Sequence, residues 1–99
     1  MTDWQALREQ IARDRGKWCE CCGCAFWTEL HHSLIHRMKG HPELDCIENL
    51  QAVCPACHPY QNGHETRRRF WQSQCELCGA VHMREWLDGL DLKVKESYE

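Results

Sequence analysis

Apolar residues recur at helical spacing near the start of the chain, at Trp4, Leu7 and Ile11. Spacings of three and four residues, with charged residues between them, predict an amphipathic helix over residues 3–15. Thr2 and Gln5 occupy the positions of a capping box, in which both side chains bind free amide groups at the helix start. Gly16 follows as the expected stop. We expect the apolar face of this helix to cover the core.

Two short segments favour β-structure. Residues 26–31 are rich in aromatic and β-favouring side chains, and residues 50–53 form a second such run. The first strand would direct His31 and His32 to opposite faces, because side chains alternate along a strand. The segment between them, residues 36–46, is a predicted loop.

Prolines mark the start of the next element. Pro55 and Pro59 stand where a helix would begin, because proline is favoured in the first helical turn. His58 would then lie in the first turn of a helix that runs to about Gln72. The Asn-Gly pair at 62–63 is the point where this helix could kink or divide.

The C-terminal part carries the negative charge of the chain. Residues 83–90 have the pattern of a short amphipathic helix, and we expect the acidic tail that ends at Glu99 to be loose. The net charge is −3, and residues 76–99, with three basic and six acidic side chains, supply all of it. The rest of the chain is neutral before histidines and metals are counted, so net charge neither supports nor excludes a nucleic-acid partner.

Nine cysteines in 99 residues change this picture. Because one domain of this size buries little apolar area, it needs additional cross-links, either disulfides or bound metal ions. The sequence opens on polar and charged residues and has no run of 18 apolar residues, so we expect no membrane span and an intracellular, cytoplasmic protein. In that compartment, Cys-x-x-Cys pairs and an odd cysteine count favour zinc over disulfides.

The first two cysteine motifs predict one structural zinc. Segment 19–24 contains two interleaved Cys-x-x-Cys pairs. A glycine directly after Cys22 favours the Cys19/Cys22 pair, because glycine eases the tight turn of a zinc knuckle. Together with Cys54 and Cys57, this pair would supply four thiolates to the ion.

A third motif, Cys75-x-x-Cys78, leaves a second zinc open. The other groups that could complete such a site are Cys21, Cys24, His82 and Cys46. The motif could instead hold a metal between two subunits, and Cys21 with Cys24 could be inert buried thiols. Whether the protein is a monomer or a homodimer does not follow from these patterns.

Histidines and amides remain once the thiolates are assigned to zinc. A four-thiolate zinc is coordinatively full, so metal-assisted catalysis would need a second, open ion. His31 and His58, with Asn62 as a weaker ligand one helical turn after His58, suit a divalent ion completed by water and phosphate. His32 is the best general base, because imidazole takes up protons near neutral pH. Asn49 could orient that imidazole through a hydrogen bond.

The combined pattern resembles the HNH endonucleases of the zinc-stapled type. The residues that carry the resemblance are Cys19-x-x-Cys-Gly, Leu-His31-His32, Glu-Asn49-Leu and Cys54-x-x-Cys-His58, within about residues 17–71. It implies a small zinc-stabilised α+β domain with a ββα-metal (His-Me finger) core, an N-terminal helix and a short C-terminal helix. Residues 1–16 would form the first helix, 17–72 the nuclease core, and 73–99 the C-terminal knuckle, helix and tail.

The same resemblance implies roles for single residues. His31 would be the first metal ligand, His32 the general base, Asn49 the orienting residue and His58 the ligand on the helix, with Asn62 at the position of a further ligand. It implies Mg²⁺, Mn²⁺ or a similar catalytic ion, binding in the minor groove of double-stranded DNA, and nicking or double-strand cleavage. Small members of this family resemble bacteriophage or mobile-element enzymes. The crowded first cysteine segment and the third knuckle depart from the family pattern and leave the zinc register open.

Basic residues near these motifs are candidate DNA contacts, namely Arg67, Arg68, Arg69, Lys17, Arg37 and Lys39. The run at 67–69 lies on the helix predicted to start near His58. These arginines could contact DNA phosphates, or they could simply form the solvent-exposed face of that helix. Arg13 and Arg15, near the end of the first helix, are further candidates.

Two interpretations from other classes compete with the endonuclease. One is a zinc-stabilised nucleic-acid-binding or adaptor module with a vestigial nuclease site, and the other is a zinc-ribbon interaction domain. Neither requires His31, His32 and Asn49 together, whereas phosphodiester hydrolysis needs a base, an orienting group and a metal ligand.

Overall fold

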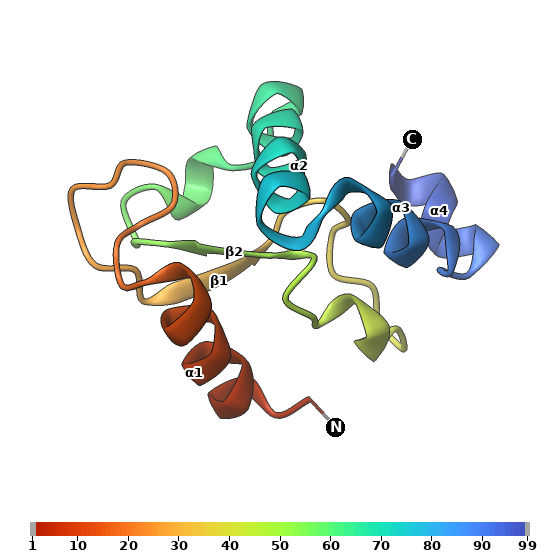
Figure 1. Cartoon of the computed structure of the whole chain (residues 1–99), viewed down its shortest axis with the longest axis horizontal. Coiled ribbons are helices and arrows are strands. Elements are labelled where there is room, and N and C mark those ends of the chain that lie inside the picture. Colours follow the sequence, from red (N-terminus) through yellow and green to blue (C-terminus); the bar gives the residue numbers. More distant parts are fainter. Residues whose placement is uncertain (1, 99) are drawn as a thin grey trace.

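The fold is built on a two-stranded antiparallel hairpin with helices on both sides (Figure 1). The computed structural model describes residues 2–98, with side chains for residues 2–96. Its elements are α1 (Trp4–Arg15), β1 (Glu29–His32), the 3₁₀ turn η1 (Pro42–Leu44), β2 (Leu50–Val53), the 3₁₀ turn η2 (His58–Tyr60), α2 (His64–Cys78), α3 (Ala80–Asp88) and α4 (Leu92–Tyr98). The structure is therefore a small α+β protein.

The hairpin register decides which residues meet. Glu29 lies opposite Val53, and His32 lies opposite Leu50. Side chains on one face, among them Leu50 and Ala52, pack with Ile11 of α1. Figure 1 shows α1 and α2 on opposite sides of the hairpin, so each face is covered by a different helix.

The larger apolar cluster lies away from α1 and joins the three C-terminal helices to the loop that follows β1. Its buried members are Leu34, Ile35, Leu44, Phe70, Met83, Leu87 and Val94. Val94 is fully buried there, although it belongs to a tail that the sequence predicted to be loose. Burying such a side chain contributes about 1.5–3 kcal/mol, which holds a helix of seven residues that would not form alone. The loose-tail prediction was wrong for the described residues, and Glu99 lies outside them.

The first helix begins at Trp4, one residue later than predicted, ends at Arg15 as predicted, and has a different cap. Asp3, and not Thr2, is the N-cap residue, and its side chain accepts a hydrogen bond from the amide of Ala6. Thr2 donates to Asp45 on the distant loop instead. The capping box was therefore wrong, whereas the stop at Gly16 is confirmed by its φ of 87°.

The predicted helix over residues 55–72 is divided. His58 begins the isolated turn η2, and α2 starts only at His64, so the interruption falls at the expected Asn-Gly pair. The helix then continues to Cys78, past the predicted boundary between residues 72 and 73. The third Cys-x-x-Cys motif is thus the last turn of a helix and not a knuckle. No described helix has the length and apolar character needed to cross a membrane.

The buried side chain of Arg15, at the end of α1, connects this helix to β2 and to α2. Its guanidinium donates to the carbonyl oxygens of Leu50 and Ile47 at 2.5 and 3.1 Å and to Gln74 Oε1 at 3.2 Å. It also pairs with Glu20 at 3.2 Å, and only 6% of its side chain is exposed. Burial lowers the pKa of Arg15, and Glu20 opposes that shift. The proposed DNA contact of Arg15 was therefore wrong, because the guanidinium is committed to the interior.

Replacing Arg15 by Met should lower the free energy of unfolding by about 2–4 kcal/mol, because two buried carbonyls and Glu20 lose their partner. Urea denaturation followed by tryptophan fluorescence measures this change. Arg13→Met is the matched control, since the Arg13 side chain is 73% exposed, and a shift within about 0.5 kcal/mol is expected. Equal stability of the two variants would contradict the structural role of Arg15.

Candidate metal sites and the histidine cleft

Four cysteine sulfurs meet where the chain leaves α1 and where it leaves β2. The Sγ atoms of Cys19, Cys22, Cys54 and Cys57 all lie within 4.8 Å of one another. This set could hold a zinc ion, because four thiolates at this spacing match a tetrahedral site. The structure thus selects the Cys19/Cys22 register over Cys21/Cys24.

The first two sulfurs are held by a tight loop. An isolated bridge between Trp18 and Phe26 closes its ends. Gly23, directly after Cys22, has a φ of 67°, in the left-handed region that glycine adopts without strain. The amide of Glu20 donates to the Ala52 carbonyl at 2.8 Å, which attaches this loop to β2.

Backbone amides point at the sulfurs. The amides of Cys21 and Cys54 donate to Cys19 Sγ at 3.4 and 3.3 Å, and the amide of Cys24 donates to Cys22 Sγ at 3.4 Å. Burial opposes ionisation of the Cys19 thiol, but hydrogen bonds from the backbone amides of Cys22, Cys54 and Cys21 outweigh it and lower its pKa to about 6. By contrast, the hydrogen bond with Cys54 is the main cause that raises the pKa of Cys57. Four sulfurs this close cannot all ionise unless a cation shares their charge.

The other cysteines are not gathered into a second site. Cys21 accepts a hydrogen bond from Gln61 Nε2 at 3.2 Å. Cys75 and Cys78 pack half-buried against the larger apolar cluster, and burial raises the pKa of Cys46 to about 12. Among the described residues, no second group of three or more metal-binding side chains comes together. The grouping of Cys21, Cys24, Cys75 and Cys78 proposed for a second zinc is absent from the described part of the chain.

An open cleft of about 370 Å³ lies beside the start of α1 and contains most of the predicted catalytic residues. Its lining consists of Trp4, Leu30, His31, His32, His36, Arg37 and His58. The rings of His31 and His58 are T-shaped, with centroids 5.0 Å apart. The structure thus brings the two predicted metal-binding histidines together from β1 and η2.

Hydrogen bonds fix which nitrogen of each ring carries a proton. His31 Nε2 lies 3.2 Å from the Gln61 carbonyl oxygen, and His58 Nδ1 lies 2.5 Å from Glu29 Oε1. Both partners only accept hydrogen bonds, so these nitrogens donate. In the neutral rings His31 Nδ1 and His58 Nε2 therefore keep their lone pairs. Metal-binding histidines commonly show this arrangement, in which the second nitrogen donates to a carboxylate or carbonyl.

Burial is the main cause that lowers the pKa of His31, and the neighbouring His58 adds to this effect. Only 8% of His31 is exposed. At neutral pH the ring is therefore uncharged and able to bind a cation. Because the pKa of His31 is lowered, protons compete with a metal for its ring only at pH values below the usual titration range of histidine.

The side chain of His32 leaves β1 on the opposite face from that of His31, although both border the cleft, and it has a carboxylate partner. Its Nε2 lies 2.7 Å from Asp45 Oδ1, and both side chains are nearly buried, at 12% and 13% exposure. Thr2 donates to Asp45 Oδ2 at 2.6 Å. Burial would raise the pKa of Asp45, but the bonds from Thr2 and His32 prevail and lower it. Because Asp45 accepts the proton of Nε2, the neutral ring keeps its lone pair on Nδ1.

Asn49 braces the backbone and does not contact the ring of His32. It is fully buried, and its Oδ1 accepts from the amides of Leu34 and Ile35 at 3.0 and 2.9 Å. Its Nδ2 donates to the carbonyl oxygens of Ile35 and Leu44 at 2.9 and 3.0 Å. The expected bond from Asn49 to the imidazole was wrong, because Asp45 makes that contact.

The remaining predicted site residues have different surroundings. Asn62 is exposed and follows η2, so it does not lie one helical turn after His58. Arg37 borders the histidine cleft, and Lys39 is exposed on the same loop as Arg37. Lys17 is exposed beyond α1.

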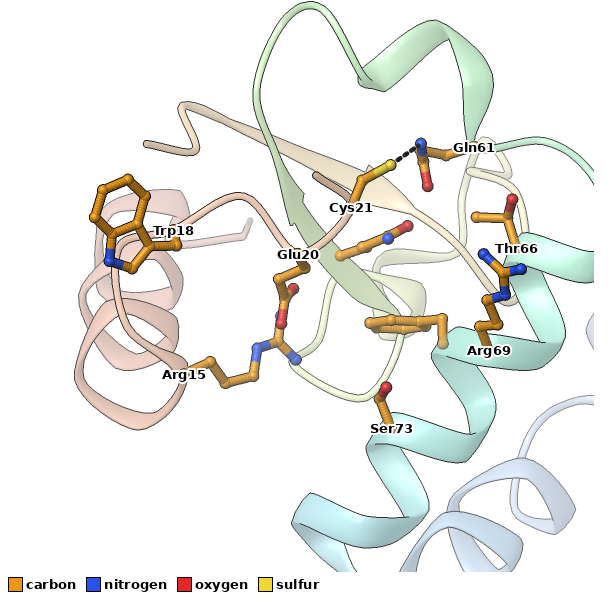
Figure 2. Close-up of a pocket in the computed structure, with 10 residues that line it drawn as sticks. Arg15, Trp18, Glu20, Cys21, Gln61, Thr66, Arg69 and Ser73 are labelled. Atoms are coloured by element: carbon orange, nitrogen blue, oxygen red, sulfur yellow. Dashed lines mark hydrogen bonds and ion pairs between the residues drawn. The ribbon is translucent and has the colours of Figure 1, made fainter. Parts of the chain in front are cut away.

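The arginine run lies on α2. Arg68 and Arg69 are exposed and pair with Glu65 at 2.7 and 3.4 Å, and Arg67 is half-buried. Arg69 lines a second cavity of about 340 Å³ between α2 and the first cysteine loop (Figure 2). In Figure 2 the Arg15–Glu20 pair and the contact between Cys21 and Gln61 occupy its wall. These groups are engaged with one another, so this cavity lacks the arrangement of a base beside metal ligands.

Sequence reasoning missed Glu29, Asp45 and Gln61. Glu29 could have been found, because it lies two residues before His31 and so shares its strand face. Asp45 comes from the loop, and no periodicity connects it to His32. The Gln61 carbonyl carries no sequence signal, because every residue has one.

Comparisons with protein-family models, with curated proteins and with solved structures gave no match for this chain.

The purified protein should contain one zinc per chain, measured by elemental analysis, and chelation should lower its melting temperature. Cys22→Ser should lose the zinc, whereas Cys24→Ser should keep it, because only Cys22 belongs to the sulfur cluster. Both cysteines are exposed, which makes the pair well matched. Zinc loss in Cys24→Ser, or two zinc ions per chain, would contradict the assignment.

Asn49→Ala should lower the free energy of unfolding by about 2–4 kcal/mol, because buried amides and carbonyls lose their partners. Asn62→Ala, at an exposed position, should change it by no more than about 0.5 kcal/mol. Chemical denaturation of both variants with zinc bound makes the comparison. A stable Asn49→Ala protein would show that the brace is dispensable.

Proposed function

We propose that this protein is a metal-dependent endonuclease that hydrolyses phosphodiester bonds of double-stranded DNA. His32 is the general base, and a divalent ion such as Mg²⁺ or Mn²⁺ binds to His31 and His58. One observation carries the proposal. Each of these three histidines lines the same cleft and donates one ring N–H to a protein acceptor, which leaves its other nitrogen to bind a proton or a metal.

The protein groups divide the work of hydrolysis among them. His32 Nδ1 takes the proton of the attacking water, and Asp45 stabilises the imidazolium that results. When bound, the divalent ion supplies positive charge for the phosphoryl oxygens and the leaving oxygen. Glu29 and the Gln61 carbonyl hold His58 and His31 in the tautomers that bind it.

The zinc proposed for the cysteine cluster is structural in this scheme. Four thiolates fill a tetrahedral ion and leave no position for water or phosphate. The hairpin, the loop between its strands and α2 would form the ββα-metal core of an HNH endonuclease. One difference is that His58 lies in the turn η2, before α2 and not on it.

Basic side chains near the cleft support a polyanionic substrate. Arg37 borders the cleft, and Lys39 follows it on the same exposed loop. They could contact phosphates on either side of the scissile bond without reading the base sequence. Arg67, Arg68, Arg69 and Lys17 would contact phosphates further away.

Purified protein should nick supercoiled plasmid in the presence of a divalent ion, and EDTA should abolish the reaction. His32→Ala should lower the rate by at least about 100-fold, because the base contributes on the order of 10²–10⁴-fold. Asp45→Asn should also slow the reaction, since its partner would no longer favour the imidazolium. Agarose gels of plasmid forms over time measure all three rates.

His82→Ala is the matched control, because His82 also pairs with a carboxylate, Glu48 at 2.8 Å, but lies on α3. It should nick at the wild-type rate. Zinc content and melting temperature are measured for every variant, so that unfolding is not mistaken for lost chemistry. DNA binding without nicking under any divalent ion would support the adaptor module and overturn the enzyme.

A further inference from the structure

The cavity between α2 and the first cysteine loop takes no part in the proposed hydrolysis, yet two buried polar atoms without partners belong to its lining residues. Gln61 Oε1, an acceptor, and Arg15 Nε, a donor, make no hydrogen bond, and no other buried side-chain nitrogen or oxygen of the described residues lacks one. Both residues line this cavity of about 340 Å³, a volume typical of ligand sites. Buried polar groups are normally paired, so two exceptions at one cavity point to a polar ligand.

The Gln61 side chain is fixed with its acceptor in the cavity wall. Its Nε2 donates to the Cys57 carbonyl at 2.9 Å and to Cys21 Sγ at 3.2 Å, so both amide hydrogens are in use. Only 2% of the residue is exposed. Figure 2 shows the amide oxygen turned toward the space that the lining residues surround. The protein supplies no donor to this oxygen, so a ligand must bring its own N–H or O–H.

Donors from two other elements complete the polar lining. Thr66, Arg69 and Ser73 of α2 stand three or four residues apart and therefore share one helix face. Gln51 of β2 is nearly buried, and its Oε1 accepts from Ser33 Oγ at 3.2 Å, which leaves its amide hydrogens as donors. The cavity thus combines one buried acceptor with several donors.

Trp18 adds a flat aromatic surface to this lining. It borders the cavity, and 57% of it is exposed. Its ring lies 4.8 Å from that of Phe26, at an interplanar angle of 34°, and Phe26 is itself 60% exposed. A backbone bridge between the two residues holds the pair in place. Exposed aromatic side chains beside cationic groups are the surfaces on which proteins stack unpaired bases.

We propose that this cavity binds an unpaired nucleobase of a nucleic-acid strand. The base stacks on Trp18, donates an N–H to Gln61 Oε1 and accepts from Arg15 Nε, and Arg69 contacts the neighbouring phosphate. Nucleobases fit because they are flat and carry donors and acceptors along their edges.

This site goes beyond the proposed function, which needs only a DNA backbone at the histidine cleft. The two sites meet at Gln61, whose carbonyl bonds to His31 in the cleft while its side chain lines this cavity. A strand with an unpaired base would therefore be held beside the cleft by the base as well as by its phosphates.

Fluorescence anisotropy of a short labelled oligodeoxycytidine strand with the zinc-loaded full chain tests the site, without a further divalent ion so that no cleavage occurs. An abasic strand of equal length keeps every phosphate and should bind at least about tenfold more weakly. A strand with phenyl groups in place of the bases can stack but not form hydrogen bonds, and it should bind at least about fivefold more weakly. Equal affinity of the oligodeoxycytidine for either comparison strand overturns the proposal.

Two matched pairs of variants locate the site. Trp18→Ala should weaken binding of the oligodeoxycytidine by at least about fivefold, whereas Trp18→Phe should stay within about twofold of the wild type. Tyr60→Ala is the control, because Tyr60 is 78% exposed but lies outside the lining.

The second pair is Arg69→Gln and Arg68→Gln. Both arginines are exposed and pair with Glu65, but only Arg69 lines the cavity. Arg69→Gln should weaken binding at least about fivefold, and Arg68→Gln less than about twofold.

Zinc content and melting temperature are measured for each variant, so that lost folding is not mistaken for lost binding. Equal affinities within either pair overturn the base site. Plasmid nicking by a protein that binds abasic and oligodeoxycytidine strands alike keeps the endonuclease and removes the base site. Base-dependent binding that requires Trp18 and Arg69, without nicking under any divalent ion, keeps the base site and overturns the endonuclease.

Discussion

The crowding of four cysteine sulfurs within 4.8 Å is the constraint on which the structure depends. These sulfurs can all be thiolates only if positive charge lies between them. Backbone amides supply part of that charge, and a bound cation would supply the rest. The apolar side chains are divided among separate clusters, so their packing cannot replace a metal ion bound by the cysteines. Two clusters lie on the two sides of the hairpin, and the buried cysteines Cys19 and Cys54 belong with Val53 to a third, small one. Metal binding and folding are therefore expected to be one equilibrium.

Two buried polar side chains connect the parts that apolar packing leaves separate. Arg15 joins the end of α1 to the backbone around β2 and to Gln74 on α2. Asn49 joins the exit of β1 to the loop at Leu44. Both bind backbone groups that would otherwise be buried without partners, and such groups cost more to leave unpaired than the bonds gain. Polar contacts thus set the relative positions of elements in a protein whose core is small.

Local patterns predicted the elements better than their contacts. The spacing of Trp4, Leu7 and Ile11 predicted α1 to within one residue, because helical periodicity is encoded within a few residues. The Cys19/Cys22 register followed from one glycine, since the left-handed turn is a local demand. The partner of His32 and the buried role of Arg15 were missed, because each depends on residues distant in sequence. The tail was misjudged for a similar reason: Val94 is held by a core assembled from three other segments.

The sulfur cluster and the histidine cleft are physically coupled through β2. Glu29 lies opposite Val53 in the hairpin, and the next residue, Cys54, belongs to the sulfur cluster. From Cys54 the chain turns through Cys57 to His58, whose amide donates to the Cys54 carbonyl at 3.1 Å. The turn that carries two of the four sulfurs therefore also places His58 against Glu29. Loss of the metal proposed for the sulfur cluster is therefore expected to disturb the contacts of His58 with Glu29 and His31.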